Sequence, residues 1–75
     1  MAEPRLGNRL REARAAHGWT QAELAQRVGV SRKTINTVEN SVFVPSTLLA
    51  LGLARALGRS VEELFFLFAP DDQCD

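Results

Sequence analysis

The side chains best suited to binding chemistry lie in a short polar stretch of the first half of the chain. Arg32, Lys33, Asn36 and Thr37 succeed one another at helical offsets, which bring them onto one side of a helix. The two apolar residues of the stretch are three apart and are predicted to turn inward. Cations and hydrogen-bond donors gathered on one side can bind a partner, although these residue types are equally typical of a solvated helix face.

Two short helices, over about residues 21–28 and 32–39, are predicted to hold this stretch. Thr20 is a hydroxyl N-cap for the first helix, and a carboxylate three residues later completes a reciprocal capping box. Gly29 is suited to the left-handed conformation that ends a helix, and Ser31 is a good cap for the next. Two helices joined by a short turn that contains glycine form a helix-turn-helix.

Three further helices complete an all-α prediction. The first covers about residues 5–16, and the fourth begins after Ser46 and ends at Gly58. The fifth opens with a second capping box at Ser60 and ends before Pro70. Apolar residues at helical spacing give each helix an inward face. Connections of two to six residues predict a compact five-helix bundle with almost no strand.

The length of 75 residues predicts one domain, which covers residues 5–69 and leaves residues 1–4 and 70–75 as flexible ends. An apolar fraction of 45% is enough for a compact core. The single cysteine, Cys74, cannot form an internal disulfide and lies in an acidic tail, which favours a free thiol in a reducing, cytoplasmic setting. No segment approaches the roughly 18 consecutive apolar residues of a membrane span.

A net charge of zero hides an uneven distribution of charge along the chain. Residues 1–37 carry seven Arg or Lys against three Glu, which gives +4. Residues 38–75 carry two Arg against six acids, which gives −4. A polyanionic partner is therefore expected to meet the N-terminal half.

The sequence contains no residue set that is typical of catalysis or metal binding. It has one His, one Cys and no Tyr, and it has no glycine-rich phosphate loop. His17, at the end of the first helix, is suited to bonding free helix carbonyls. Glu62 and Glu63 suit the dipole of the first turn of the fifth helix. These features argue against an enzyme and indicate no cofactor, metal or small-molecule site.

The run from Asn8 to Phe65 resembles the phage repressor and Cro-type helix-turn-helix family. The matching segments, in the family's order and spacing, are NRLREAR, GWTQAELAQRVGVSRKTINTVEN, VPS and ALGRSVEELF. The run covers more than three quarters of the chain, and its caps, glycines, apolar positions and polar positions all agree with the family. The resemblance implies a bundle of the lambda-repressor type that binds double-stranded DNA.

The resemblance also implies that the helix over residues 32–39 reads base edges in the major groove. Arg32 would pair with guanine, Asn36 with adenine and Thr37 with a thymine methyl. Lys33 would read a base or hold a phosphate. The expected contacts to the DNA backbone are Gln21, Ser31, Thr34, Asn40 and Arg9, of which Asn40 is also a suitable helix cap.

Arg14 and Glu39 occupy positions at which the family has a partly buried ion pair. The resemblance therefore implies a structural role for these two residues, not contact with DNA. The pair would tie the first helix to the end of the third.

The chain departs from the family directly after Asn40. Where the family usually has a glycine and then a basic residue, this chain has Ser41-Val42-Phe43-Val44. Ser41 must take a left-handed backbone at some cost, or the loop must bend differently. The missing cation removes a phosphate contact, so each copy of the chain is expected to bind DNA weakly.

Apolar residues outside the predicted core indicate a second copy of the chain. Leu48 and Leu51 would project from the fourth helix, and Phe66 would project from the fifth. Together with Val42 and Phe43 they would form a larger apolar patch than a small monomer tolerates; the alternative is that some of them cover the core. We expect a symmetric homodimer through the fourth and fifth helices, with its two reading helices about 34 Å apart.

The function expected from the resemblance is that of a cytoplasmic, sequence-specific transcriptional regulator of bacterial or phage type. It is expected to be a repressor that binds a palindromic operator. One alternative is a protein-interaction module of the same fold, such as an antitoxin or anti-repressor. A restriction–modification controller is a further alternative that the sequence does not separate.

Overall fold

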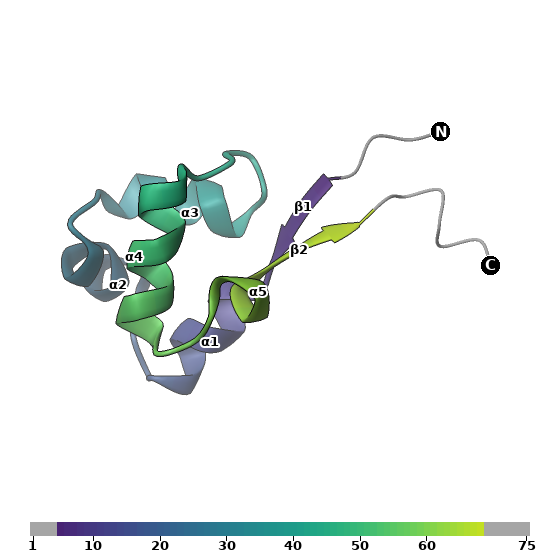
Figure 1. Ribbon diagram of the computed structural model, residues 1–75. Coiled ribbons are helices and arrows are strands. Elements are labelled where there is room, and N and C mark those ends of the chain that lie inside the picture. Colours follow the sequence, from purple (N-terminus) through teal and green to yellow (C-terminus); the bar gives the residue numbers. More distant parts are fainter. Residues whose placement is uncertain (1–4, 69–75) are drawn as a thin grey trace.

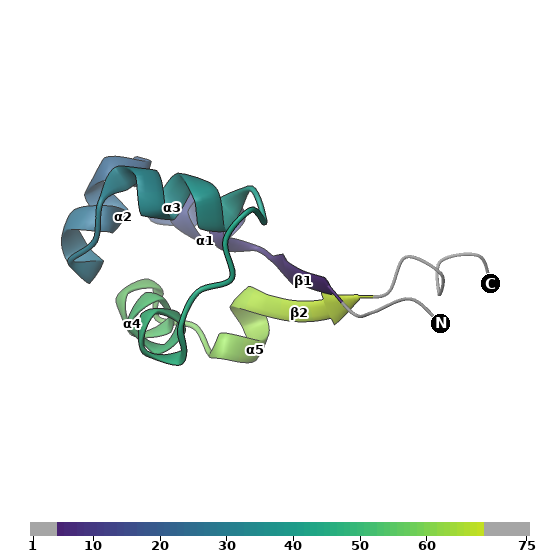
Figure 2. The ribbon, with the colours of Figure 1, turned by 90° about the horizontal axis from the view of Figure 1, so that it is seen from above.

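The computed structural model describes residues 5–68 and confirms the expected bundle of five helices, to which it adds a small two-stranded sheet. The elements in chain order are β1 (Arg5–Asn8), α1 (Leu10–Ala16), α2 (Gln21–Val28), α3 (Arg32–Glu39), α4 (Thr47–Leu57), α5 (Val61–Leu64) and β2 (Phe65–Phe68). The two strands form a ribbon that projects from the helices (Figure 1). Seen from above, α2 and α3 lie on one side of the molecule, and α4 and α5 lie on the other (Figure 2). None of the helices within residues 5–68 has the length and apolar character needed to cross a membrane.

The core receives apolar side chains from every helix and from the first residue of β2. Leu10, Leu24, Ile35, Leu53 and Leu64, one from each helix, have no exposed surface. Complete burial of a side chain of this size stabilises the fold by about 1.5–3 kcal/mol. The core therefore fixes how α2 and α3 are oriented relative to the other helices.

Hydroxyl residues cap the starts of four helices. The side chains of Thr20, Ser31, Ser46 and Ser60 each accept a hydrogen bond from the backbone N–H three residues later. Gly29 ends α2 with a left-handed backbone, at φ 86°. The tight turn between α2 and α3 is thus built from the residue types that the sequence indicates.

The expected extents of the first and fifth helices are wrong. Residues 5–8 form β1, and the first helix begins only at Leu10. The fifth helix ends at Leu64, and residues 65–68 form β2. Three phenylalanines and a leucine in succession favour a strand once a partner strand is available. That partner comes from the opposite end of the described chain.

Gly7 and Phe66 lie opposite each other in this antiparallel ribbon. A Cβ atom on residue 7 would overlap the outer end of the Phe66 ring, so glycine there leaves room for the ring in its observed position. Phe66, expected to project from a helix, is half-buried on β2. Phe68 is also half-buried on the ribbon.

Candidate nucleic-acid interface

α3 has one buried side and one exposed polar side. Ile35 and Val38 lie in the core, with at most 1% of their surface exposed. The expected base readers Arg32, Lys33 and Asn36 are exposed. The helical offsets of the sequence thus bring these three side chains together on one accessible surface.

Ser31, Thr34 and Thr37 organise the start of α3 through their hydroxyl groups. Ser31 Oγ accepts a hydrogen bond from the backbone N–H of Thr34 at 3.1 Å and lies 2.9 Å from the Thr34 hydroxyl. The Thr37 hydroxyl donates to the carbonyl oxygen of Thr34 at 2.9 Å. Both threonines are half-buried. Because its proton is used within the helix, Thr37 retains a methyl group and an accepting lone pair for a partner.

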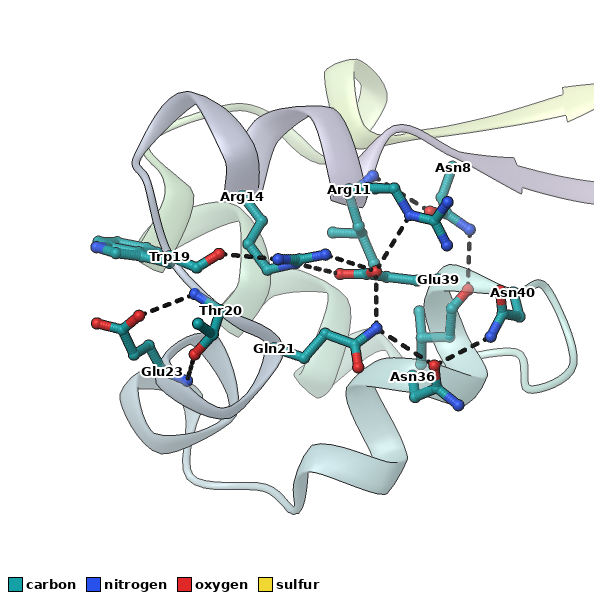
Figure 3. Close-up of polar contacts among 12 residues, drawn as sticks. Asn8, Arg11, Arg14, Trp19, Thr20, Gln21, Glu23, Asn36, Glu39 and Asn40 are labelled. Atoms are coloured by element: carbon teal, nitrogen blue, oxygen red, sulfur yellow. Dashed lines mark hydrogen bonds and ion pairs between the residues drawn. The ribbon is translucent and has the colours of Figure 1, made fainter.

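Glu39, the last residue of α3, has a fully buried side chain that is surrounded by donors (Figure 3). Arg14 donates to it twice, from Nε to Oε2 at 2.7 Å and from Nη2 to Oε1 at 3.2 Å. Arg14 Nη1 also donates to the carbonyl oxygen of Trp19 at 2.8 Å. A paired, charged contact of this kind is stronger than a neutral hydrogen bond. It joins α1, the segment before α2 and the end of α3.

The donors around Glu39 lower the pKa of its carboxyl group. Burial alone would raise that pKa, but the hydrogen bonds from Arg14 and Gln21 and the positive charges of the two nearby arginines together outweigh the burial, so the pKa lies below its ordinary value. Arg11, whose Nε lies 3.8 Å from Oε1, adds a weaker attraction. Arg11 was not expected at this site, although it precedes Arg14 by three residues and so shares its helical side.

The amide side chains of Gln21, Asn36 and Asn40 continue this network across α2 and α3 (Figure 3). Gln21 Nε2 donates to Glu39 Oε1 at 3.1 Å and to Asn36 Oδ1 at 3.3 Å. Asn40 Nδ2 donates to the same Asn36 oxygen at 3.1 Å. Three residues expected to contact DNA are therefore bonded to one another, and the side-chain donors of Gln21 are used within the protein.

Ser41 takes the left-handed conformation, the first of the two alternatives that its sequence position allows. Its φ is 61°, and its N–H donates to the carbonyl oxygen of Val38 at 3.1 Å. The N–H of Val42 donates to the carbonyl oxygen of Thr37 at 2.9 Å. These two bonds make up a Schellman motif, which normally has glycine at the position of Ser41. A left-handed backbone costs a residue with a Cβ atom roughly 1–2 kcal/mol.

Two neighbouring residues connect the start of α1 to other parts of the fold. Arg9, expected at the DNA backbone, has its guanidinium over the ring of Phe66, 4.4 Å from the centroid. Asn8 Nδ2 donates to the carbonyl oxygen of Val38 at 2.9 Å, and its Oδ1 accepts from the N–H of Leu10 at 3.2 Å. Asn8 was not expected at the site. Asparagine just before an apolar helical run is a capping signal, but the expected earlier start of α1 concealed it.

His17 bonds a helix-end carbonyl, as its position suggests, but the carbonyl belongs to α4. Its Nε2 lies 2.8 Å from the oxygen of Leu57, and Nε2 must carry the hydrogen because a carbonyl only accepts. The His17 ring stacks on Trp19, with centroids 4.2 Å apart. The guanidinium of Arg27 lies 4.1 Å from the Trp19 centroid. This stack supports the turn before α2, and no local sequence signal indicates it.

The five apolar residues expected at a dimer interface lie on three different parts of the structure. Leu48 and Leu51, on α4, are 82% and 56% exposed. Val42 and Phe43 are exposed in the loop after α3. Phe43 also lines a hollow with residues of α3. Phe66 is half-buried on the ribbon.

Some sequence expectations concern the chain ends. The flexible ends and the free thiol of Cys74 fall in residues 1–4 and 69–75, outside the described residues. Within residues 5–68, no group of three or more His, Cys, Asp or Glu is placed to hold a metal ion.

Residues 10–64 match a family model described as helix-turn-helix. The chain belongs to the helix-turn-helix family. Its match to an uncharacterized HTH-type transcriptional regulator of Methanothermobacter thermautotrophicus is 51% identical over 59 residues, 77% of this chain and 86% of the relative. The antitoxin HipB of Escherichia coli is 42% identical over 36 residues, which is 48% of this chain and 41% of HipB.

A solved structure also resembles this one. The restriction-modification controller protein C.AhdI from Aeromonas hydrophila superposes with a TM-score of 0.68 at 37% identity, over 72% of this chain and 82% of that chain. The residues matched by the helix-turn-helix model begin with α1 and end with α5. The model thus covers all five helices, and the β1–β2 ribbon lies outside it.

Proposed function

We propose that this protein is a sequence-specific, DNA-binding transcriptional regulator that places α3 in the major groove. The observation that carries the proposal is the exposed polar side of α3, which offers Arg32 and Lys33 from a helix anchored through the buried Glu39. A major groove about 12 Å wide admits a helix, and donors near its N-terminus reach base edges. Membership of the helix-turn-helix family supports the same reading.

The proposed contacts follow the side chains that α3 leaves accessible. Arg32 pairs with guanine O6 and N7, Lys33 holds a phosphate or reads a base, and Thr37 meets a thymine methyl. The proposed contacts to the DNA backbone are Gln21, Ser31, Thr34, Asn40 and Arg9. Gln21 contributes its backbone N–H at the start of α2, where the helix dipole attracts anions, because its side-chain donors are bonded to the protein.

We further propose that the protein acts as a homodimer on a palindromic operator. The exposed Leu48 and Leu51 on α4 offer apolar surface to a second copy. A single copy has Val42 where a cation would add a phosphate contact, so the second copy compensates for weak half-site binding. Twofold symmetry sets the two α3 helices about 34 Å apart. A dimer bound over a promoter in the cytoplasm blocks transcription and so represses.

Selection of bound sequences from random duplexes, repeated at several salt concentrations, tests the proposal. We expect an enriched inverted repeat and a binding constant whose logarithm falls linearly with the logarithm of salt. Failure to enrich any sequence would reject DNA reading. Sedimentation at tens of micromolar tests the homodimer separately, because a monomer at that concentration contradicts only the dimer.

A second candidate is a regulator that acts mainly through a protein partner, as an antitoxin does. The 36-residue match to HipB and the exposed apolar residues Val42, Phe43 and Leu48 favour it. Such a protein would bind its partner tightly through these apolar residues and would show no salt-dependent binding to duplex DNA. The same salt series therefore separates the two candidates.

A further inference from the structure

In the amide network beside α3, the donor and the acceptor of each hydrogen bond are fixed, because the network starts at a carboxylate. The Glu39 side chain has no exposed surface, and its oxygens, once ionised, only accept hydrogen bonds. The Gln21 atom that lies 3.1 Å from Oε1 must therefore be Nε2, the donor of that amide. This contact fixes which way the Gln21 amide is turned.

The same reasoning fixes the orientation of Asn36. Gln21 Nε2 offers only donors, so the Asn36 atom 3.3 Å away must be the accepting oxygen Oδ1. Asn40 Nδ2 donates to that oxygen as well, at 3.1 Å. Oδ1 thus accepts two hydrogen bonds, the full number for its two lone pairs. The Asn36 amide nitrogen points away from both neighbours (Figure 3), and it keeps its two N–H donors.

We propose that this network makes Asn36 a donor-only reader, that is, a side chain that can offer a base only hydrogen-bond donors. Such a side chain selects guanine first and thymine second. The inference rests on the proposed function, because it concerns α3 in the major groove. Adenine recognition by an amide needs an accepting oxygen for N6 as well as a donor for N7. In this protein Gln21 and Asn40 occupy that oxygen. Guanine offers two acceptors, O6 and N7, to the free NH₂ group, whereas cytosine offers a donor and is rejected.

Gln21 is then a positioning residue that sets base preference without touching the base. Its replacement by methionine keeps the length of the side chain and removes one of the two donors to Asn36 Oδ1, the one whose direction the buried Glu39 fixes. Asn40 alone then bonds Asn36, and because Asn40 is an exposed amide the two amides can turn together, so that adenine becomes an acceptable base. Gln26 provides a matched control, because it is a glutamine on the same helix with an exposed side chain.

The first experiment compares selected duplexes for the wild type, Gln21→Met and Gln26→Met. The base pair read by residue 36 is the one whose preference disappears in Asn36→Ala. We expect the wild type and Gln26→Met to favour guanine or thymine over adenine there by about tenfold, the lower part of the range for a good amide–base contact. We expect Gln21→Met to lose that discrimination. An adenine preference in the wild type, an unchanged preference in Gln21→Met, or no affected position in Asn36→Ala would overturn the proposal.

Asn36→Asp tests the donor itself and preserves the internal bonds. Its carboxylate still accepts from Gln21 and Asn40, but it has no donor for guanine. The preference at that base pair should move to cytosine, whose N4 amino group donates to a carboxylate. The added negative charge should also weaken binding to every duplex. Retention of guanine by this variant would contradict donor-only reading.

NMR of the free protein examines the network without DNA. In Asn36→Ala we expect one of the two Gln21 Nε2 proton signals to move, because its acceptor is lost, while the Gln26 signals stay in place. If neither Gln21 signal moves, the assigned amide orientation is wrong. If neither the wild type nor any variant enriches a duplex, both the proposed DNA binding and the proposed base preference are rejected. A selected duplex with adenine at this base pair rejects only the inference.

Discussion

Arg14 Nε lies 2.7 Å from Glu39 Oε2, and this contact holds a carboxylate in the last turn of α3. A negative charge at a helix C-terminus opposes the helix dipole. Burial adds a desolvation cost, because the Glu39 side chain has no exposed surface and Arg14 is only 16% exposed. The two hydrogen bonds from Arg14 offset both costs, and they fix the end of the helix whose other end is proposed to read DNA.

Arg14→Met should lower the free energy of unfolding by about 3–5 kcal/mol, because it leaves a buried carboxylate without its main partner. Urea denaturation at neutral pH measures the loss. Arg11→Met is the matched control, because Arg11 is 65% exposed and its Nε lies 3.8 Å from the same carboxylate. An exposed pair of this kind contributes at most about 1 kcal/mol. Equal losses in the two variants would contradict the role assigned to Arg14.

Stability should fall in acid partly through Glu39. Its folded-state pKa lies below the ordinary value near 4.5, so its contribution is complete above pH 4.5. That contribution is lost as the pH falls through the lower, folded-state pKa, where the carboxylate takes up a proton. Urea denaturation between pH 7 and pH 3 should therefore show a shallower decline for Glu39→Gln than for the wild type. A residual decline remains, since hydrogen bonds from the Thr20 and Ser60 backbone lower the pKa of Glu23 and Glu63. Parallel curves would show that Glu39 does not contribute to the acid response.

Ser41→Gly should stabilise the protein by about 0.5–1 kcal/mol. The change removes the roughly 1–2 kcal/mol that a left-handed backbone costs a residue with a Cβ atom. Glycine also increases the conformational entropy of the unfolded chain, which cancels about half of that gain. Thermal unfolding measures the shift. Gly58→Ser makes the reverse change at an equivalent position, because Gly58 ends α4 at φ 70°. This variant should lose stability by a similar amount. A destabilised Ser41→Gly would show that the serine side chain contributes more than its backbone conformation costs.

Arg32→Ala should relax preference at one base pair, at a cost of roughly 1–3 kcal/mol for the preferred base. Lys33→Ala, if Lys33 holds a phosphate, should weaken all duplexes alike and reduce the salt slope by about one. Binding to the selected operator and to single-base variants of it, over a range of salt, measures both effects. A uniform loss in Arg32→Ala would refute base reading by Arg32.

Leu48→Glu should convert the proposed homodimer to a monomer. The 82% exposure of Leu48 means that the substitution leaves the core of a single copy unchanged. Sedimentation at tens of micromolar should show the dissociation, with the helical circular dichroism retained. Gln26→Glu, an exposed change on α2, controls for the added charge away from the proposed interface. A dimer that survives Leu48→Glu would place the interface elsewhere.

The helices that carry the site are predictable because their signals are local. Thr20 and Ser31 cap α2 and α3 through bonds to residues three positions away, and Gly29 ends α2 within the same short stretch. Side-chain capping and left-handed glycine depend on a few neighbouring residues, so the sequence contains all that determines them. The polar side of α3 follows from helical spacing alone.

The ribbon and the amide network depend on contacts between distant residues. Phe66 belongs to a strand that pairs with β1, where it lies opposite Gly7, and helical spacing gives no indication of that pairing. Gln21 and Asn36 are separated by 15 residues, and their bond depends on the position of the buried Glu39. The expectation that these residues contact DNA came from the family resemblance, whereas the direction of each amide required the folded geometry.

The β1–β2 ribbon has a consequence for the order in which the chain folds. It joins the first and last elements of the described chain, so its formation requires closing nearly the whole polypeptide into a loop. The α2–α3 pair requires only a three-residue turn to close. Non-local pairing is slow relative to local helix contacts. We therefore expect α2 and α3 to pack together before the ribbon forms, and the ribbon to close last over helices that are already assembled.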